Sequence, residues 1–571
     1  MSARLLQQTR DLLEAAADHY AGDALALERI RGMRDRLEEP LRVAIAGMVK
    51  AGKSTLLNAI IGEEVAPTDA GECTRVIIWY RHGATPRITM QLRDGESQSL
   101  PIRRIDGRLQ IELGEATPDE IERIVVEWPS SRLRDVTLID TPGIGSLSTD
   151  ISARSASFLA PETSASSADA IVYLTRHMHS ADLGFLSAFH DPAVTPSRTV
   201  NAIAVLSRAD EIGAGRIDAL LSARGIAERY RNDGTLRSLA LDVVPIAGLL
   251  AQSARTLREH EFDALLRLAR LGRTARERML VSVDRFVRTD ALPDIPPEER
   301  TRLLERFGMF GLRMAAASIR AGHEDASALA DELYRRSGMD ELVHLVGGQF
   351  RSRADVLKSS SVLTALRALI VERPPSAAGF LAGAIERLEA NAHELRELAV
   401  LAAARTSGIG LPREQSEDAE RLIGGSGTDL PSRLGLDADA SAEELHGAAT
   451  EALRRWRALA GSPLLDRAAA EACDVVVRTC ESLVVAAGPE SVGRRGVRLA
   501  LRAEPAMGGG QQREDPRDDR EGEPAEHERL DEEAELGHGE EREGGRRRDG
   551  VHDEDRDLDP ARAPAPVDQE R

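Results

Sequence analysis

The stretch Gly47-Met-Val-Lys-Ala-Gly-Lys-Ser54 decides the fold class of this chain. It follows a short apolar run, Leu41–Ala46, and leads into a helical pattern that starts near Thr55. A glycine-rich turn between a strand and a helix is typical of a phosphate-binding loop, in which backbone N–H groups and the helix N-terminus surround the phosphates. In such a loop Lys53 reaches the β and γ phosphates and Ser54 ligates magnesium. The stretch therefore predicts a nucleoside triphosphate site, against the alternative of a glycine turn that merely links a strand to a helix.

A second element, Asp140-Thr-Pro-Gly143, follows the apolar run Val136–Ile139. Because parallel strands end at the same edge of a sheet, Asp140 is expected beside the phosphate loop, where it can orient the magnesium shell. The N–H of Gly143 can sense the γ-phosphate, which makes the loop through Ser146 a candidate switch. An Asp-Thr-Pro-Gly turn alone is a weak sign, because these residues favour turns anyway. Its position after the phosphate loop is what indicates a nucleotide site.

The third element, Ser207-Arg-Ala-Asp210, follows the predicted strand 200–206 and lies where guanine-specific proteins read the base. A carboxylate at Asp210 accepts hydrogen bonds from the ring N–H and the exocyclic amine of guanine, whereas adenine offers no such pair of donors. Arg208 stands where lysine is usual, and its long stem can lie over the base. The alternative is a helix start capped by Asp210. With the first two elements, this one predicts GTP rather than ATP.

Two weaker patterns complete the predicted site. The loop Pro245–Gly248 follows a predicted strand and would close over the base, which brings Ile246 and Ala247 to the nucleotide. Between the first and second elements, Thr74 is expected to coordinate magnesium and position the attacking water, with Thr68 as the competing choice. Both the loop at 245–248 and Thr74 are assigned from their positions in the chain relative to the three motifs.

Apolar runs of strand type recur along the first 250 residues, and helical patterns separate the later ones. The predicted strands cover residues 41–46, 75–81, 87–92, 121–127, 135–139, 170–174, 200–206 and 242–246. This alternation predicts an α/β domain with a doubly wound, mostly parallel sheet. Residues 75–92 are expected to form an antiparallel hairpin around His82-Gly83 at its edge.

Helical patterns flank this domain on both sides. Two amphipathic helices are expected within residues 3–39, and a capping box at Ser441 and Glu444 opens a long predicted helix toward Val485. After about residue 505, charged residues, glycine and proline dominate, which predicts disorder. The predicted domains are N-terminal helices at 1–40, the nucleotide domain at 41–254, a large α-helical region at 255–500 and a disordered acidic tail at 501–571.

Composition narrows the class of protein. The chain of 571 residues has a net charge of −20, which argues against a nucleic acid partner. With no run of 18 apolar residues and no signal segment, we expect neither a membrane-spanning nor a secreted protein. Three cysteines are too few for a disulfide framework, so the cytoplasm is the expected compartment. Lysine occurs only at Lys50, Lys53 and Lys358, and two of these three lie in the phosphate loop.

Residues 47–62, 67–75, 140–143 and 207–210 together resemble the dynamin superfamily, and most of all bacterial dynamin-like proteins of the isoniazid-inducible kind. The specific mark is Pro67-Thr-Asp-Ala-Gly-Glu-Cys-Thr74 after the GKST loop. The resemblance implies a GTPase head with a helical neck and trunk. It also implies GTP hydrolysis stimulated by head-to-head dimerisation, with itself or a related dynamin-like protein, and remodelling of the cytoplasmic membrane by a peripherally associated protein.

Two positions depart from the pattern that the resemblance implies. The family often has a polar residue at the positions of Val49 and Lys50, where it helps to place the catalytic water or a monovalent cation. Val49 cannot hydrogen-bond, and the Lys50 ammonium is expected to replace the cation, so that hydrolysis needs no potassium. The alternative is a solvent-facing Lys50.

The sequence thus predicts three overlapping sets of site residues. The predicted catalytic residues are Lys53, Thr74 and Lys50, and the predicted magnesium ligands are Ser54, Thr74 and Asp140. The predicted GTP-binding residues are Gly47, Lys50, Ala51, Gly52, Lys53, Ser54, Thr55, Asp140, Gly143, Ser207, Arg208, Asp210, Ile246 and Ala247.

The glycine-rich segment 405–436 separates a helix predicted from Ser376 and the one predicted from Ser441. An antiparallel helix pair would carry this segment to a distal tip, which is where the resembling family contacts membranes. The alternative is a disordered linker without contacts. The apolar residues that would insert are Ile409, Leu411, Leu422, Ile423 and Leu430.

Two other functions compete with membrane remodelling. In the first, the nucleotide domain is a regulatory GTP switch that docks a protein or a ribosome-assembly partner through the helical region. The acidic balance and the lack of a basic RNA-binding module argue against an RNA target. In the second, the chain is a nucleotide-binding scaffold with negligible turnover, which only Val49 favours.

Overall fold

The computed structural model describes residues 2–67, 75–105, 107–143, 167–189, 201–288 and 294–488. Within them lies a nine-stranded, mostly parallel sheet with a large helical region, which confirms the predicted α/β class. The predicted tail at 501–571 lies outside these residues. The strands are β1 (Leu41–Gly47), β2 (Ile78–His82), β3 (Arg87–Leu92), β4 (Ser97–Leu100), β7 (Ile121–Trp128), β8 (Val136–Asp140), β9 (Ala170–Thr175), β10 (Ala202–Ser207) and β11 (Val243–Ile246), and β5 (Arg103–Ile105) and β6 (Arg108–Gln110) form a separate pair.

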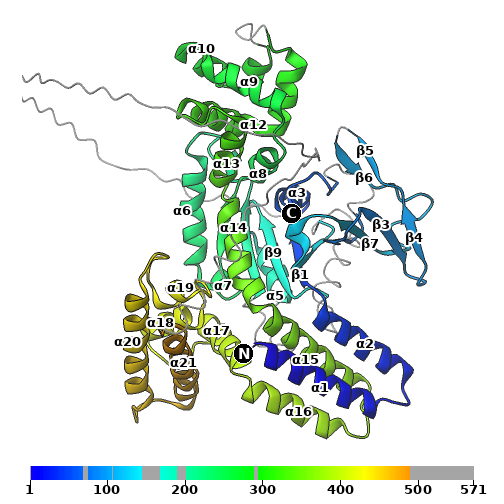
Figure 1. Ribbon diagram of the computed structural model, residues 1–571, viewed down its shortest axis with the longest axis vertical. Coiled ribbons are helices and arrows are strands. Elements are labelled where there is room, and N and C mark those ends of the chain that lie inside the picture. The colour runs from blue at the N-terminus through cyan, green and yellow to red at the C-terminus, as the bar shows by residue number, and fades with distance from the viewer. Residues whose placement is uncertain are drawn as a thin grey trace, which may run out of the picture. The chain divides into compact units, whose positions relative to one another are not determined.

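The order of strands in the sheet is β11-β10-β9-β1-β8-β2-β7-β3-β4. Figure 1 labels β9, β1, β7, β3 and β4 of this sheet. The five strands from β11 to β8 run parallel to one another, so their carboxyl ends share one edge. In the registers of the central strand β1, Ile45 lies opposite Asp140 of β8 and Gly47 lies opposite Leu174 of β9. The start of the phosphate loop and the end of β8 are therefore neighbours.

The two faces of the sheet pack against different helices, because side chains alternate along each strand. Val43 and Ile45 belong to the same buried cluster as the apolar residues of α3 and α8. Ala44 and Ala46 belong to a second cluster, with residues from α5, α6 and α7. These helices are α3 (Lys53–Ile61), α5 (Ser180–Phe189), α6 (Ala219–Arg231), α7 (Gly234–Arg237) and α8 (Gly248–Arg255), and the short turns are η2 (Ser131–Leu133) and η4 (Ala209–Glu211).

The predicted hairpin at 75–92 is wrong. β2 pairs in parallel with β7 and antiparallel with β8, whereas β3 pairs antiparallel with β7 and β4. β7 therefore lies between β2 and β3, although it comes almost 30 residues later in the chain. The buried side chains of Ile124 and Val126 complete the core beside Tyr80 and Ile88, and this packing outweighs the short connection that would have favoured a hairpin.

The remaining helices lie before and after the sheet. The N-terminal pair α1 and α2 packs against α15, and α1 also packs against α16 (Figure 1). No helix in the described part of the chain is long and apolar enough to cross a bilayer. The helices are α1 (Ser2–His19), α2 (Ala24–Glu38), α9 (Glu259–Arg270), α10 (Arg273–Met279), α11 (Val283–Arg288), α12 (Pro297–Arg320), α13 (Ala326–Arg336), α14 (Met339–Leu345), α15 (Ala354–Glu372), α16 (Ala378–Asn391), α17 (His393–Arg405), α18 (Arg413–Ile423), α19 (Leu430–Leu434), α20 (Ala442–Ala460) and α21 (Arg467–Ala486), with η5 (Val346–Phe350) and η6 (Arg351–Arg353) before α15.

Buried charges hold the junction between α2 and β1. Arg36 of α2 donates to Asp169, just before β9, with 2.8 Å between Nη2 and Oδ1. Lys358 of α15 donates from Nζ to the carbonyl oxygens of Leu37 (2.7 Å) and Glu39 (3.1 Å) at the end of α2. A compact ammonium suits two adjacent carbonyls at a helix C-terminus. The one lysine outside the phosphate loop thus joins the N-terminal helices to α15.

The segment 405–436 is not the predicted loop. It contains α18 and α19, and its residues Ile409, Leu422, Ile423 and Leu430 are buried. It also contacts the predicted nucleotide domain, because Glu420 of α18 accepts from Arg237 of α7 with 2.7 Å between Oε2 and Nη2. Packing of these apolar side chains against α17 and α21 decides their position, so they are unavailable to a membrane.

The prediction of one long helix from Ser441 toward Val485 is also wrong, because two helices form there. α20 begins at the predicted capping box, but it ends at Ala460, and α21 starts only at Arg467. The two helices pack against each other. The connecting turn carries Leu464, whose surface is 92% exposed.

Candidate functional site

The phosphate loop starts where β1 meets the end of β9. A Cβ on Gly47, whose φ is +146°, would lie 2.2 Å from the carbonyl oxygen of Leu174. Only glycine therefore allows the chain to leave the sheet at this point. Gly52 then adopts a left-handed conformation and caps the start of α3. The strand, the turn and the helix predicted around this loop are all present.

Lys53 is the first residue of α3, and its ammonium folds back over the loop. Nζ donates to the carbonyl oxygens of Gly47 (3.2 Å) and Met48 (3.4 Å). Burial lowers the pKa of Lys53, and the nearby carboxylate of Asp140 partly offsets this effect. The loop thus holds one ammonium against backbone carbonyl oxygens, at a place where bound phosphate charge would attract it.

Ser54 and Asp140 come together at the same edge of the sheet. The hydroxyl of Ser54 donates to Oδ2 of Asp140 at 3.2 Å. Burial raises the pKa of Asp140 to about 6, although Lys53 and Ser54 both act to lower it. Oδ1 of Asp140 is buried and has no hydrogen-bond partner among the described residues. A hydroxyl beside a carboxylate with a spare oxygen fits magnesium, which prefers oxygen ligands.

Gly143 lies directly against the phosphate loop. A Cβ at Gly143 would approach Cγ2 of Val49 to 2.7 Å and its Cα to 2.9 Å. Glycine is therefore needed for the two loops to touch, and Val49 borders the place where Gly143 could meet a γ-phosphate. Lys50, with φ of +63°, is exposed. The predicted switch residues Thr74 and Ser146, and the competitor Thr68, lie outside the described residues.

A cavity of about 150 Å³ joins the phosphate loop to the predicted base-reading turn. Ser207 ends β10, and its Oγ donates to the carbonyl oxygen of Thr175 at 3.1 Å. Arg208 has a left-handed backbone (φ +53°), and Asp210 follows within η4. The predicted GTP-binding residues that line this cavity are Ala51, Gly52, Thr55, Ser207, Arg208, Asp210 and Ile246.

Asp210 carries a perturbed carboxyl group. Burial raises its pKa to about 6, the neighbouring Glu211 raises it further, and Arg208 and Arg176 act to lower it. Asp210 is thus ionised at neutral pH and able to accept the two donors of guanine. Sequence reasoning missed Glu211 and Arg176, because no motif marks them.

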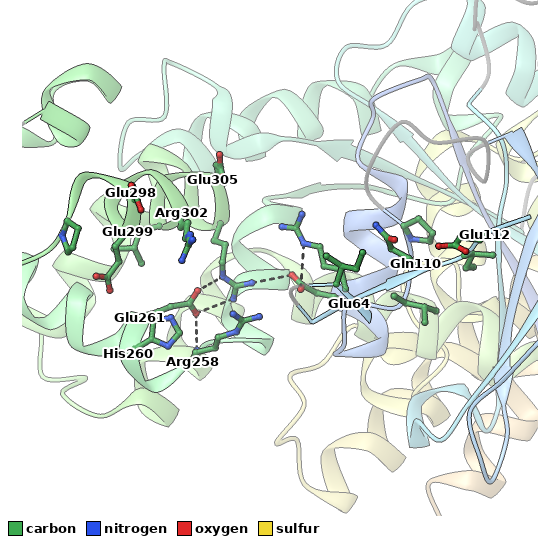
Figure 2. A pocket seen from close by; sticks show the side chains of 18 of the residues that line it. Glu64, Gln110, Glu112, Arg258, His260, Glu261, Glu298, Glu299, Arg302 and Glu305 are labelled. Carbon is green, nitrogen blue, oxygen red and sulfur yellow. Dashed lines mark hydrogen bonds and ion pairs between the residues drawn. The ribbon is translucent and has the colours of Figure 1, made fainter. Parts of the chain in front are cut away.

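A second cavity, of about 1120 Å³, lies between β6 and the helices α9 and α12. Glu64 and Pro67, which precede the predicted switch residue Thr74 in the chain, also line it. Figure 2 shows Glu64 and Glu261 on opposite sides of one arginine side chain. This is Arg306 of α12, whose Nη1 lies 3.2 Å from Glu64 and which also pairs through Nε with Glu261 at 2.5 Å. Gln252 of α8 donates to Glu64 at 2.9 Å. This buried network joins the segment after α3 to the helical region, and sequence periodicity gave no sign of it.

Replacing Arg306 with alanine is expected to lower the free energy of unfolding by about 3 kcal/mol, because it leaves two buried carboxylates without their shared cation. Glu64 and Glu261 have side chains that are each 6% exposed. Urea denaturation followed by circular dichroism measures the effect. The control is Arg302→Ala, since Arg302 lies on the same helix but is exposed; equal effects of the two variants would contradict a special role for the buried network.

The fold and the site define an α/β protein with a phosphate-binding loop. The dynamin family profile matches residues 43–201. The isoniazid-induced protein IniC of Mycobacterium tuberculosis is 42% identical over 471 residues, which cover 82% of this chain and 94% of that protein. The chain therefore belongs to the dynamin family, as the sequence motifs predicted.

Two further relatives match shorter stretches. The bacterial dynamin-like protein of Nostoc punctiforme is 33% identical over 155 residues, covering 24% of this chain and 22% of that protein. The isoniazid-induced protein IniA of Mycobacterium tuberculosis is 34% identical over 127 residues, covering 21% and 20%. A solved structure of an oligomerised bacterial dynamin pair aligns with 87% of this chain and 75% of its own, at 13% identity and a TM-score of 0.28.

Proposed function

We propose that this chain binds GTP with magnesium and hydrolyses it as a dynamin-like mechanochemical GTPase. The observation that carries the proposal is the meeting of Lys53, the Ser54–Asp140 pair and the turn around Asp210 at one edge of the sheet. Membership of the dynamin family supports it. Residues 41–254 would form the GTPase domain, with residues 1–40 and 255–500 as neck and trunk.

Each residue at the predicted phosphate site has a distinct part in this proposal. Lys53 exchanges the carbonyls of Gly47 and Met48 for the β and γ phosphates. Ser54 and Asp140 would hold magnesium, with Thr74 as a further ligand, and the ion would supply positive charge to offset that of the phosphates. Thr74 would also position the attacking water, because Val49 cannot, and Lys50 would supply positive charge near the bridging oxygen.

We further propose that the protein associates peripherally with the cytoplasmic membrane and works as a head-to-head dimer, with itself or a related dynamin-like protein. The membrane contact would use the neck-end patch, defined here as Leu25, Val371 and Phe380. These side chains are 51%, 78% and 58% exposed. They lie where the α1–α2 turn packs on the α15–α16 turn, as the hydrogen bond from Tyr20 to the carbonyl oxygen of Arg373 (2.8 Å) indicates. A cluster of exposed apolar residues is a stronger sign of an interaction surface than the single residue Leu464.

The test is phosphate release from GTP with and without anionic liposomes, together with cosedimentation in GTP, in GDP and without nucleotide. We expect several-fold stimulation by liposomes. Val371→Glu/Phe380→Glu should reduce cosedimentation about tenfold or more, since each buried apolar side chain contributes roughly 1.5–3 kcal/mol. The matched control, Leu464→Glu, should cosediment like the parent chain.

Other outcomes would favour the competing functions. If liposomes do not change the rate of GTP hydrolysis and the chain does not cosediment with them, membrane remodelling is contradicted and a regulatory GTP switch is favoured. GTP binding without measurable turnover would favour a scaffold. Equal cosedimentation of the parent chain and the double variant would exclude the neck-end patch as the membrane contact.

A further inference from the structure

Three charged side chains form a chain of ion pairs beside the predicted base site. Arg208 donates from Nη1 to Oε1 of Glu211 at 2.7 Å. Arg176, which follows β9, pairs with the other carboxylate oxygen of Glu211. Glu211 also lines the cavity that contains Asp210. One carboxylate thus links the ends of two neighbouring parallel strands at the mouth of this cavity.

The base-reading turn has Arg208 where lysine is usual, and this difference explains why a carboxylate such as Glu211 is needed beside it. A guanidinium is a planar fork that works best against an oxygen pair, whereas an ammonium is a compact point charge. Arg208 also has a left-handed backbone (φ +53°), which is uncommon for residues other than glycine and changes the direction in which its side chain leaves the backbone. Holding its guanidinium on Glu211 fixes the direction of the stem that would lie over the base.

We propose that Glu211 is a positioning residue for guanine nucleotide binding: it holds Arg208 along the base and sets the charge around Asp210. The inference rests on the proposed function, because it concerns the same nucleotide site. Arg176 assists by occupying the second carboxylate oxygen. Glu211 touches neither the phosphates nor magnesium in this assignment, so it acts only through Arg208 and Asp210.

The proposal has a signature in the pH dependence of binding. The groups that act on Asp210 are Glu211, which raises its pKa, and Arg208 and Arg176, which lower it. Guanine binding needs the Asp210 carboxylate, and its pKa of about 6 means that affinity falls as the pH drops through this value. Removing the charge of Glu211 lowers the pKa of Asp210. The acid limit of binding then moves to lower pH, even though affinity at neutral pH is weaker.

The experiment measures the affinity of a fluorescent GDP analogue between pH 5 and 8 for the full chain and its variants. Glu211→Gln should weaken binding about fivefold at pH 7.5, as expected for loss of a partly exposed ion pair, and should move the acid midpoint down. Glu211→Asp keeps the charge and should keep the midpoint. Glu228→Gln, an exposed carboxylate on α6, is the control that should match the parent.

The outcomes separate this inference from the proposed function. Binding by the parent chain, with the same affinity and acid midpoint in Glu211→Gln, would overturn the role of Glu211 and leave the proposed function standing. A parent chain that binds no guanine nucleotide would overturn both. A weaker affinity with an unmoved midpoint would show a merely structural effect and would also overturn the proposal. Equal thermal unfolding midpoints of all variants would show that each one folds.

Discussion

Replacing Lys53 with alanine is expected to abolish guanine nucleotide binding. Lys53 carries a partly buried ammonium, and its Nζ already lies within 3.4 Å of two loop carbonyl oxygens. Without it, the phosphates would meet backbone donors but no fixed cation. Leaving a buried charge without its partner costs roughly 3–5 kcal/mol, which corresponds to a loss of about a hundredfold to a few thousandfold in affinity.

Titration calorimetry with GTP in the presence of magnesium measures this loss. The control is Arg302→Ala, which removes an exposed cation on α12 and should leave the affinity for GTP unchanged. Lys50→Ala, in the other lysine of the loop, should lose turnover and weaken GTP binding far less than Lys53→Ala, because the Lys50 side chain is exposed. Micromolar affinity for GTP in the Lys53→Ala variant would contradict the assignment of the phosphate loop.

Replacing Asp210 with asparagine is expected to exchange the base preference of the site. An amide can accept only one of the two hydrogen bonds that guanine offers, and its NH₂ would face a donor. Sites built to hydrogen-bond a substrate reject a mismatched one strongly, so affinity for GTP should fall roughly a thousandfold or more. Xanthosine triphosphate has a carbonyl in place of the amine, and it should bind better to the variant than to the parent.

Competition binding of GTP and xanthosine triphosphate tests this expectation. Asp210→Asn should also lose the decline in affinity near pH 6, because the variant has no carboxyl group to protonate there. The control is Asp218→Asn, a carboxylate just before α6 whose side chain is 44% exposed. Unchanged preference for GTP over xanthosine triphosphate would show that the base is read elsewhere.

The sequence was most informative about the phosphate and base loops. Each of these loops combines a short apolar run with a turn, and both signals are local. Parallel strands bring their carboxyl ends to one edge, so the order of the motifs was enough to predict that Ser54 lies beside Asp140. The roles of these residues in binding and hydrolysis remain predictions until they are measured.

Sequence patterns were misleading where several partners could satisfy the same residues. The apolar run that became β2 could pair with any strand, and the short connection to β3 favoured the wrong one. Apolar side chains such as Leu422 and Ile423, set among glycines, look alike whether they face lipid or a protein core. Only the position of α18 against α17 and α21 shows that they are buried.

By itself the sequence determined the family, the α/β class and the order of the nucleotide loops, because these depend on residues that are neighbours along the chain. The tertiary structure alone decided which distant charges meet. Arg306 reaches Glu64 across 242 positions, and Lys358 reaches Leu37 across 321. No local pattern marks such pairs, because their geometry arises only when the core on both sides has packed and excluded water from them.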